Sequence, residues 1–374
     1  MIDRIGLLTF HASYNNGSML QAYALQNVLK NRYGIEAEII NFSNGEQKRM
    51  YSIFYAPRKL KDVFRNALNA LFWKSIHDHN KDYIKFSCDN LLVSKKRYAT
   101  LHELENENFA YKLVIAGSDQ VWNINAKDFD DAYFLPFIKG IPKIAYAVSL
   151  GATNPNFCAD KNKYAEYMQS FAAISVREGN AKKWLEMLGN SSIMICVDPT
   201  LLLPKLEWEK LVGEREVKGK YIFWYTRIYK KEIRDIVLQI GKKYGMPVYV
   251  MDAKEWSRRG LYLKGIKLVR KGGPSSYLSL IKNAEMVITS SFHGTVFSYI
   301  FNKNFWYLNI HDFETTDDRA THLLSQLGLQ DRYVGKREIL GKDLLRAPDY
   351  LQKGLITDQI NKSFDYLGKY IIKE

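Results

Sequence analysis

The residues best suited to chemistry lie in segment 286–301, which contains His293. Residues 286–288 are apolar and β-branched, which predicts a buried strand, and the apolar density of 295–301 predicts a packed helix. Unpaired amides at the start of such a helix favour an anion, and a histidine beside them could transfer a proton. The segment is equally compatible with an anion-binding site and with a histidine that has only a structural role. The predicted anion-binding residues are Ser290, Ser291, Gly294 and Thr295.

A second polar cluster follows the apolar run 112–116. Small residues followed by an acid, an amide and an indole make a poor core but a good pocket. Ligands of open α/β sheets bind at the carboxyl ends of strands, where this cluster falls. Asp119 is the candidate base. The predicted pocket residues are Gly117, Ser118, Gln120 and Trp122.

A third turn, at 11–18, separates an apolar strand from a helical pattern at 19–31. Its backbone amides should reach the same edge of the sheet. It lacks both the G-x-G-x-x-G spacing and the lysine of a P-loop, so we predict neither a dinucleotide nor an ATP site. An anion or sugar pocket and a simple tight turn remain open. The residues concerned are Asn16, Gly17 and Ser18.

Two arginines follow predicted strands: Arg177 after 173–176, and Arg227 after 221–225. The planar guanidinium binds carboxylates and phosphates through two parallel hydrogen bonds. Both are candidates for holding an anionic substrate, although Arg177 could simply pair with Glu178. Asp198, followed by Pro199, is typical of a turn that leaves a domain.

The elements that would position these residues alternate strand and helix twice along the chain. This pattern predicts an α/β fold of two doubly wound domains facing a cleft. We place the first domain at 1–200, the second at 201–345, and a helix that packs back on the first domain at 346–374.

A mostly helical insertion at 57–92 interrupts the first domain. Apolar residues recur at helical spacing between 60 and 72, with Lys and Arg around them. Such a basic amphipathic helix can lie on an anionic membrane surface, although more often a helix of this kind packs on its own domain.

The composition sets broader limits. The 374 residues are 47% hydrophobic, enough for two ordinary cores, and 54 Lys+Arg against 40 Asp+Glu give a formal charge of +14. The three cysteines form no Cys-x-x-Cys pair and the histidines show no ligand spacing, so we expect no disulfide framework and no metal. Without a basic stripe interleaved with aromatics, nucleic-acid binding is not expected. We expect a cytoplasmic protein, because no signal peptide or bilayer-spanning run is evident.

The motifs together resemble the polysaccharide pyruvyl transferase family, over about residues 4–330. They occur in the order Asn-Asn-Gly-Ser-Met-Leu-Gln (15–21), Ile-Ala-Gly-Ser-Asp-Gln-Val-Trp-Asn (115–123), Ser-Val-Arg-Glu (175–178), Val-Asp-Pro-Thr (197–200) and Ser-Ser-Phe-His-Gly-Thr (290–295). Many members carry Arg and Leu before this histidine, where the present chain has Ser291 and Phe292. Either Arg177, Arg227 or Arg319 supplies the missing charge, or the chain belongs to a branch with another donor or reaction. Arg319 resembles a position of a further family element.

The resemblance implies a fold like the GT-B glycosyltransferases, with two Rossmann-like domains. It also implies transfer of a pyruvyl group from phosphoenolpyruvate to a sugar of an envelope or capsular polysaccharide precursor, as a cyclic ketal. His293 would then transfer a proton, Asp119 would activate a sugar hydroxyl, and the arginines would hold the donor, with no cofactor.

The expected partners are phosphoenolpyruvate and a sugar or lipid-linked oligosaccharide, and the charge is compatible with peripheral contact at the inner face of an anionic membrane. The alternatives are a GT-B glycosyltransferase that uses a nucleotide-sugar and a non-catalytic sugar-binding relative.

Overall fold

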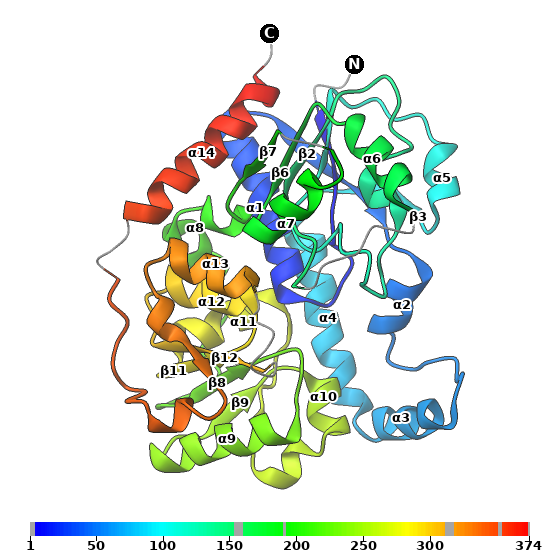
Figure 1. Cartoon of the computed structure of the whole chain (residues 1–374). Coiled ribbons are helices and arrows are strands. Elements are labelled where there is room, and N and C mark those ends of the chain that lie inside the picture. The colour runs from blue at the N-terminus through cyan, green and yellow to red at the C-terminus, as the bar shows by residue number, and fades with distance from the viewer. Residues whose placement is uncertain (1–3, 153–159, 190–191, 311–317, 351–353, 373–374) are drawn as a thin grey trace.

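The computed structural model describes residues 4–152, 160–189, 192–310, 318–350 and 354–372, arranged as two α/β domains (Figure 1). The first domain contains a seven-stranded parallel sheet in the order β3-β2-β1-β4-β5-β6-β7. Its strands are β1 (Arg4–Leu8), β2 (Glu36–Phe42), β3 (Val93–Tyr98), β4 (Leu113–Ala116), β5 (Lys143–Val148), β6 (Ala173–Val176) and β7 (Ile193–Ile195). The order reverses beside β1, so the carboxyl ends of β1 and β4 form the switch point where ligands of such sheets bind.

The second domain contains a six-stranded parallel sheet in the order β10-β9-β8-β11-β12-β13. Its strands are β8 (Ile222–Tyr225), β9 (Val248–Val250), β10 (Lys267–Leu268), β11 (Met286–Thr289), β12 (Phe305–Asn309) and β13 (Tyr333–Gly335). The fold is therefore α/β with two Rossmann-like doubly wound domains, as predicted. The switch point of this sheet lies between β8 and β11.

Helices connect and cover both sheets. Those of the first domain are α1 (Asn16–Tyr33), α2 (Gly45–Tyr51), α3 (Leu60–Leu71), α4 (Trp73–Asn90), α5 (Leu101–Glu105), α6 (Lys161–Gln169) and α7 (Gly179–Glu186). Those that follow are α8 (Lys205–Glu209), α9 (Lys231–Lys243), α10 (Ala253–Arg258), α11 (Gly273–Asn283), α12 (Phe292–Ile300), α13 (Asp318–Gln326) and α14 (Gly354–Ile371).

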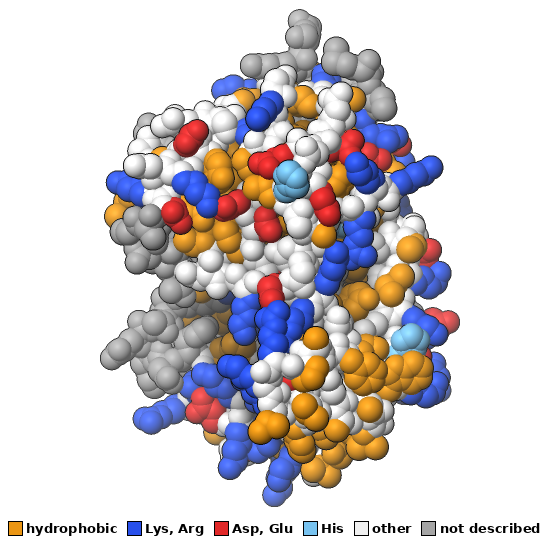
Figure 2. Space-filling model, turned by 90° about the vertical axis from the view of Figure 1, so that its right-hand side faces the viewer, with side chains coloured by type: hydrophobic (Ala, Val, Ile, Leu, Met, Phe, Trp, Pro, Cys, Tyr) orange, Lys and Arg blue, Asp and Glu red, His pale blue; other side chains and the backbone are white. Residues whose placement is uncertain are grey.

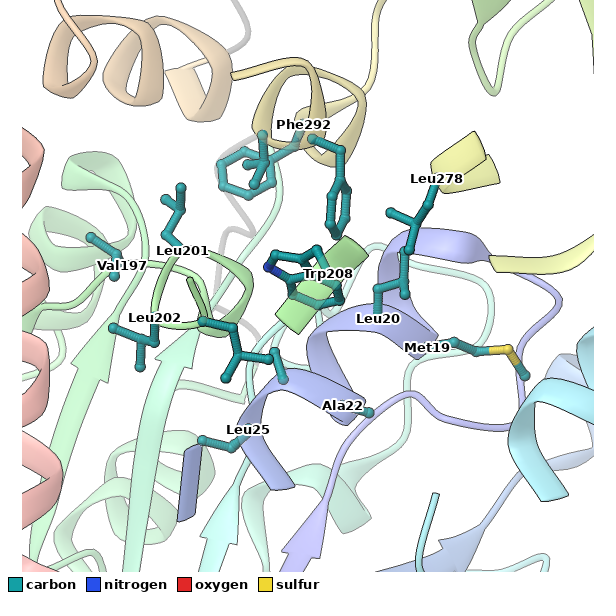
Figure 3. Close-up of a cluster of buried hydrophobic side chains, with 14 of the residues drawn as sticks. Met19, Leu20, Ala22, Leu25, Val197, Leu201, Leu202, Trp208, Leu278 and Phe292 are labelled. Carbon is teal, nitrogen blue, oxygen red and sulfur yellow. The ribbon is translucent and has the colours of Figure 1, made fainter. Parts of the chain in front are cut away.

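The two domains share a continuous apolar core around Trp208 of α8 (Figure 3). Its indole is fully buried, with the ring of Tyr23 from α1 at 5.8 Å and that of Phe297 from α12 at 4.9 Å. Burial of one large aromatic side chain contributes on the order of 2–3 kcal/mol. This core holds the start of α1 against the start of α12.

The last helix returns to the first domain. Tyr366 donates a hydrogen bond to the Ala145 carbonyl of β5 at 2.8 Å, and Ser363 accepts one from the Val197 amide at 2.9 Å. Arg32 of α1 lies over the ring of Phe364, 3.9 Å from its centroid. In Figure 1, α14 accordingly lies beside the first sheet rather than the second.

Helix α4 joins the insertion to the second domain. Each ring nitrogen of the buried His79 lies within hydrogen-bonding distance of a carbonyl, that of Met251 at 3.1 Å and that of Val269 at 3.0 Å. Gly272 allows this close approach, because a Cβ there would come within 2.8 Å of the His79 Cα. The insertion therefore forms part of the wall between the domains.

Helix α3 is turned with its polar side toward the protein. Asp62 and Asn69 are buried, and Asn69 accepts a hydrogen bond from Arg258 at 3.1 Å. The apolar side chains of Leu60 and Phe64 are 90% and 69% exposed. Of the two alternatives that the sequence left open, apolar packing on its own domain is therefore wrong for this helix.

Candidate functional site

Two polar cavities meet between the domains, at the carboxyl ends of both sheets. We name the first, of about 240 Å³, the Asp119 cavity, and the second, of about 360 Å³, the Lys254 cavity. They share part of their lining, so one space continues into the other. The shared residues are Asn15, Met50, Tyr51, Lys127 and Arg227.

Asp119 lies just past the end of β4 with a φ of 75°, which is uncommon for a residue other than glycine and costs about 1–3 kcal/mol. Its Oδ2 accepts a hydrogen bond from Ser18 Oγ at 2.5 Å, and its Oδ1 accepts one from the Gln120 amide at 2.9 Å. Ser18 of α1 and the Gln120 amide therefore hold the Asp119 carboxylate at the cavity wall.

Charged side chains surround the rest of the Asp119 cavity. Lys127 and Arg227 are exposed along its rim, and Asp128 is half-buried beside them. Burial raises the pKa of Asp128, with Arg227 opposing and Asp119 reinforcing that shift. The cavity thus combines two cations with two carboxyl groups in different environments, an arrangement suited to acid–base work on an anion.

The Lys254 cavity is lined by tyrosines and cations from both domains and from the insertion. Lys254 donates to the Met50 carbonyl at 3.0 Å, and burial lowers its pKa. Arg258 donates to the Tyr55 hydroxyl at 3.0 Å. Tyrosine rings with guanidinium and ammonium groups between them suit a sugar that carries phosphate. The other aromatic and cationic lining residues are Tyr14, Tyr51, Tyr83, Tyr225, Arg49, Arg65, Lys127 and Arg227.

Behind the cavities, Asp198 is the centre of a buried ionic network. Its Oδ2 accepts hydrogen bonds from Arg177 Nη1 at 2.7 Å and from Ser118 Oγ at 3.2 Å. The Nε2 atom of His293 lies 3.3 Å from the same oxygen. Although burial opposes ionisation, His293 and Arg177 hold the pKa of Asp198 well below its usual range.

His293 packs against the first turn of α1. A Cβ at Gly17 would lie only 2.1 Å from the His293 Nδ1 atom, so glycine is required by this close approach. The imidazole is 7% exposed, and it is absent from the described lining of both cavities. The geometry therefore places His293 between two domains rather than at an open cavity wall.

The predicted donor clamp Arg177 is engaged within the protein. It is 4% exposed, with Asp198 on one side and Glu178 Oε2 at 3.5 Å on the other. The ring of Phe292 lies 3.9 Å below its guanidinium carbon. Burial raises the pKa of Glu178, an effect that Arg177 and Arg319 oppose. Arg177 is thus buried in the network, and Arg319 is half-buried and acts on Glu178 electrostatically, whereas Arg227 is the predicted arginine that lines the cavities.

The turn before α12 is occupied by its own cap. Ser291 Oγ accepts from the Gly294 amide at 3.4 Å, and Thr295 is fully buried with its amide bonded to the Ser291 carbonyl. Ser290 Oγ lies 2.6 Å from Thr226 Oγ1. The amides of Gly294 and Thr295, which the sequence analysis assigned to an anion, are therefore already hydrogen-bonded within the turn. Gly294 itself is required by close packing, because a Cβ there would clash with Thr289.

The predicted pocket residues separate into two groups. Ser18 and Gln120 line the Asp119 cavity and Asn16 lines the Lys254 cavity. The prediction for Trp122 is wrong: its indole is fully buried, donates to the Tyr133 carbonyl at 3.0 Å and stacks on Phe134 at 4.5 Å. Gly117 and Ser118 are likewise packed beneath the cavity floor, where a Cβ at Gly117 would lie 2.8 Å from Thr9 Cβ.

Sequence reasoning missed the central position of Asp198 and the acidic partner Asp128. Asp198 does cap a turn, because its Oδ1 accepts from the Thr200 amide at 3.0 Å, but its other oxygen organises the network. Asp198 lies three residues past the end of β7, as Asp119 lies three residues past the end of β4, and an acid at a strand end was the available signal. Asp128 falls in a loop without periodicity, so only the folded chain brings it to the cavity.

Comparison with known proteins identifies the family. A model of the polysaccharide pyruvyl transferase family matches residues 15–312, which include every cavity residue named above except Tyr14. The chain belongs to this family. No curated protein matches the sequence.

Two solved structures have a similar fold. The S. aureus MnaA–UDP co-structure has a TM-score of 0.55 at 11% identity, covering 100% of this chain and 98% of that one. The Methanocaldococcus jannaschii UDP-GlcNAc 2-epimerase in complex with UDP-GlcNAc and UDP has a TM-score of 0.52 at 15% identity, covering 98% of this chain and 100% of that one. At this identity the likeness shows the fold alone, the two-domain GT-B arrangement.

None of the described helices combines the length and apolar character that crossing a bilayer would require. Within the described ranges, no group of three or more His, Cys, Asp or Glu side chains could hold a metal ion.

Proposed function

We propose that this protein transfers the pyruvyl group of phosphoenolpyruvate to a sugar of an envelope or capsular polysaccharide precursor and forms a cyclic ketal. The observation that supports this reaction is the lining of the Asp119 cavity, where two carboxyl groups and two cations surround one space. Family membership supports pyruvyl transfer as the class of reaction. The side chains that line the cavity support the roles proposed below.

The reaction requires two proton movements and charge stabilisation. The methylene carbon of the donor gains a proton, and the adjacent carbon becomes cationic and accepts the oxygens of two sugar hydroxyls. Phosphate leaves from that carbon. One hydroxyl proton balances the methyl group formed and the other leaves with phosphate. One acid, one base and a binding site for an anion are sufficient for these steps.

Arg227 and Lys127 would bind the phosphate and carboxylate of the donor, because both are exposed at the rim of the cavity. Asp119 would accept the proton of a sugar hydroxyl, held in place by Ser18. Asp128, whose pKa is raised by burial, would deliver the proton to the methylene carbon. The reaction needs no cofactor in this scheme.

His293 would act as a positioning residue in this scheme. Through Asp198 and Gly17 it connects α12 of the second domain to the switch point of the first. It would thereby set the separation of Arg227 from Asp119. Loss of His293 should then raise KM for the donor more than it lowers kcat, whereas direct proton transfer by His293 would show mainly in kcat.

The acceptor would occupy the Lys254 cavity. Tyrosine rings there would stack on a sugar, and Arg49, Arg258 and Lys254 would meet its phosphate groups. The two solved relatives contain UDP or UDP-GlcNAc on the same fold. A phosphorylated sugar is therefore the acceptor class we propose. The same likeness favours, as the second candidate, a glycosyltransferase that uses a nucleotide-sugar.

The test is a thermal-shift titration with phosphoenolpyruvate and, separately, UDP-GlcNAc, followed by measurement of phosphate released from phosphoenolpyruvate in the presence of phosphorylated sugars. A saturable shift with phosphoenolpyruvate that disappears in Arg227→Met is expected. The control is Arg270→Met, an exposed arginine of the same domain outside both cavities. A shift with UDP-GlcNAc and none with phosphoenolpyruvate would overturn pyruvyl transfer in favour of glycosyl transfer.

A further inference from the structure

The outer face of the insertion carries an exposed apolar patch. This surface, which we call the apolar patch, consists of the side chains of Leu60, Val63, Phe64, Leu71, Trp73, Tyr262 and Leu263. Leu60 is 90% exposed, Leu71 and Leu263 are each 73% exposed, and Phe64 is 69% exposed. Figure 2 shows hydrophobic side chains gathered over the lower part of this face. Contiguous exposure of this kind marks an interaction site, whereas single exposed apolar residues are ordinary.

The orientation of α3 explains why the patch exists. Asp62 accepts hydrogen bonds from the amides of Arg58 and Lys59, and Asn66 exchanges two with the backbone of Tyr55, at 2.8 and 2.9 Å. The polar side of α3 is thus satisfied by the protein, and its apolar side is left outward. Because Leu60 and Phe64 of α3 are exposed, they add no burial to the folded protein. Their apolar side chains therefore point to an apolar phase outside the protein.

The patch continues onto the second domain. The ring of Phe72, at the junction of α3 and α4, lies 5.1 Å from that of Tyr262 and 5.7 Å from that of Trp256. The insertion and the second domain therefore present one surface. A surface shared by two parts of the fold keeps a fixed orientation toward whatever it binds.

Positive charge borders the apolar patch. Segment 58–74 contains five basic residues and one acid, and the acid, Asp62, is buried and within 3.5 Å of both Arg49 and Arg65. Lys74, which pairs with Asp78, is 86% exposed, and Arg58, which pairs with Glu46, is 63% exposed. Cations therefore outnumber acids along the rim. Its cationic residues are Arg58, Lys59, Lys61, Arg65, Lys74 and Lys264.

We propose that this face docks on an anionic membrane surface, with the apolar patch inserted among the lipid headgroups and the basic rim on their phosphates. Apolar side chains on an outward helix face with Lys and Arg around them are the arrangement that such binding requires. A second copy of the chain fits less well, because a symmetric contact would bring two basic rims together in a molecule of net charge +14.

Docking in this orientation would bring the Lys254 cavity toward the membrane. Arg65 of α3 lines that cavity, and Arg258 both lines it and contacts Asn69 on the buried side of the same helix. A lipid-linked sugar could then reach the cavity from the headgroup layer. This consequence rests on the proposed function, whereas the docking itself does not.

The test is sedimentation of the intact protein with vesicles of phosphatidylcholine alone and of phosphatidylcholine with phosphatidylglycerol. We expect binding to the anionic vesicles that weakens as salt is raised, since charge screening acts on the basic rim. The double variant Leu60→Ser/Phe64→Ser should lower the partition constant at least about tenfold. Substitution of such exposed side chains should leave the melting temperature unchanged.

The matched control is Met187→Ser/Leu206→Ser, two side chains that are 72% and 66% exposed away from the insertion. It should bind vesicles like the unaltered protein. Equal vesicle binding by the two double variants, or no binding to anionic vesicles, would overturn the proposal. So would a dimer in solution that Leu60→Ser/Phe64→Ser dissociates. Because sedimentation needs no substrate, its outcome is independent of whether phosphoenolpyruvate is the donor.

Discussion

Substitution of Gly17 by alanine tests the contact between the two domains most directly. The added Cβ would lie 2.1 Å from Nδ1 and 2.5 Å from Cγ of His293, so the ring would have to move by more than about 1 Å to reach ordinary contact. Asp198 and the neighbouring Phe292 ring, whose centroid is 5.2 Å from that of His293, restrict this movement. Overpacking of this kind costs about 1–3 kcal/mol.

The helix itself would favour the substitution, because alanine is better than glycine within a helix by up to about 1 kcal/mol. Gly45, the first residue of α2, offers a matched control, since nothing lies within 4 Å of a Cβ built there. We expect Gly45→Ala to be neutral or stabilising. Gly17→Ala should lower the free energy of unfolding by about 1–2 kcal/mol after the helix gain is subtracted.

Urea unfolding followed by circular dichroism measures both variants. The cost of Gly17→Ala should largely disappear in a His293→Ala background, because the clashing ring is then absent, and this coupling isolates the contact. If Gly17→Ala were as stable as Gly45→Ala, the described packing of α1 against His293 would be refuted.

Three further outcomes follow from the same geometry. Asp198→Asn should cost about 3–5 kcal/mol at pH 7, because it removes the carboxylate nearest to the buried Arg177 charge and leaves that charge with the more distant Glu178, at 3.5 Å. Because the pKa of Asp198 is depressed in the folded state, its contribution to stability is present above about pH 4 and is lost as the pH falls toward the folded-state pKa. Below about pH 4 the unfolding free energy of the variant should therefore fall less steeply than that of the unaltered protein. Urea unfolding at a series of pH values measures this difference. Asp128→Asn should raise the melting temperature at pH 7, where the buried charge is a cost, and abolish phosphate release; an unchanged turnover would exclude Asp128 as the acid. Phe292→Leu should lower stability by about 1 kcal/mol through loss of the guanidinium–ring contact, and a neutral result in urea unfolding would show that this contact contributes nothing.

The alternation of strands and helices could be predicted from the sequence, because buried parallel strands are continuously apolar whereas the helices are amphipathic. It located β1, β4, β8 and β11, and hence the strand ends that carry Asp119 and Arg227. Residues placed by a strand end could therefore be predicted. Trp122 could not, because whether an indole beside a strand end faces a pocket or the core depends on distant partners, here the Tyr133 carbonyl and the Phe134 ring.

The buried network illustrates the same limit. Arg177, Asp198 and His293 were each visible in motifs, but not their pairing. The adjacent ends of β6 and β7 bring Arg177 to Asp198, and the seating of the second domain on the first brings His293 to the same carboxylate. An arginine at a strand end has the same sequence signature whether it binds a substrate or an internal carboxylate. Only the 2.7 Å contact to Asp198 distinguishes the two.

By itself, the sequence determined the two doubly wound domains, the family and the excess of basic residues, since these depend on local periodicity, motif order and composition. The tertiary structure decided which charged groups face the cavities, because Arg227 and Asp128 come from segments about 100 residues apart. It also decided the outward direction of α3, whose pattern is amphipathic whichever side is buried. The hydrogen bond that Asn69 accepts from Arg258 and the ion pair of Asp62 with Arg49 fixed that direction, and pairing of this kind leaves no periodic trace in the chain.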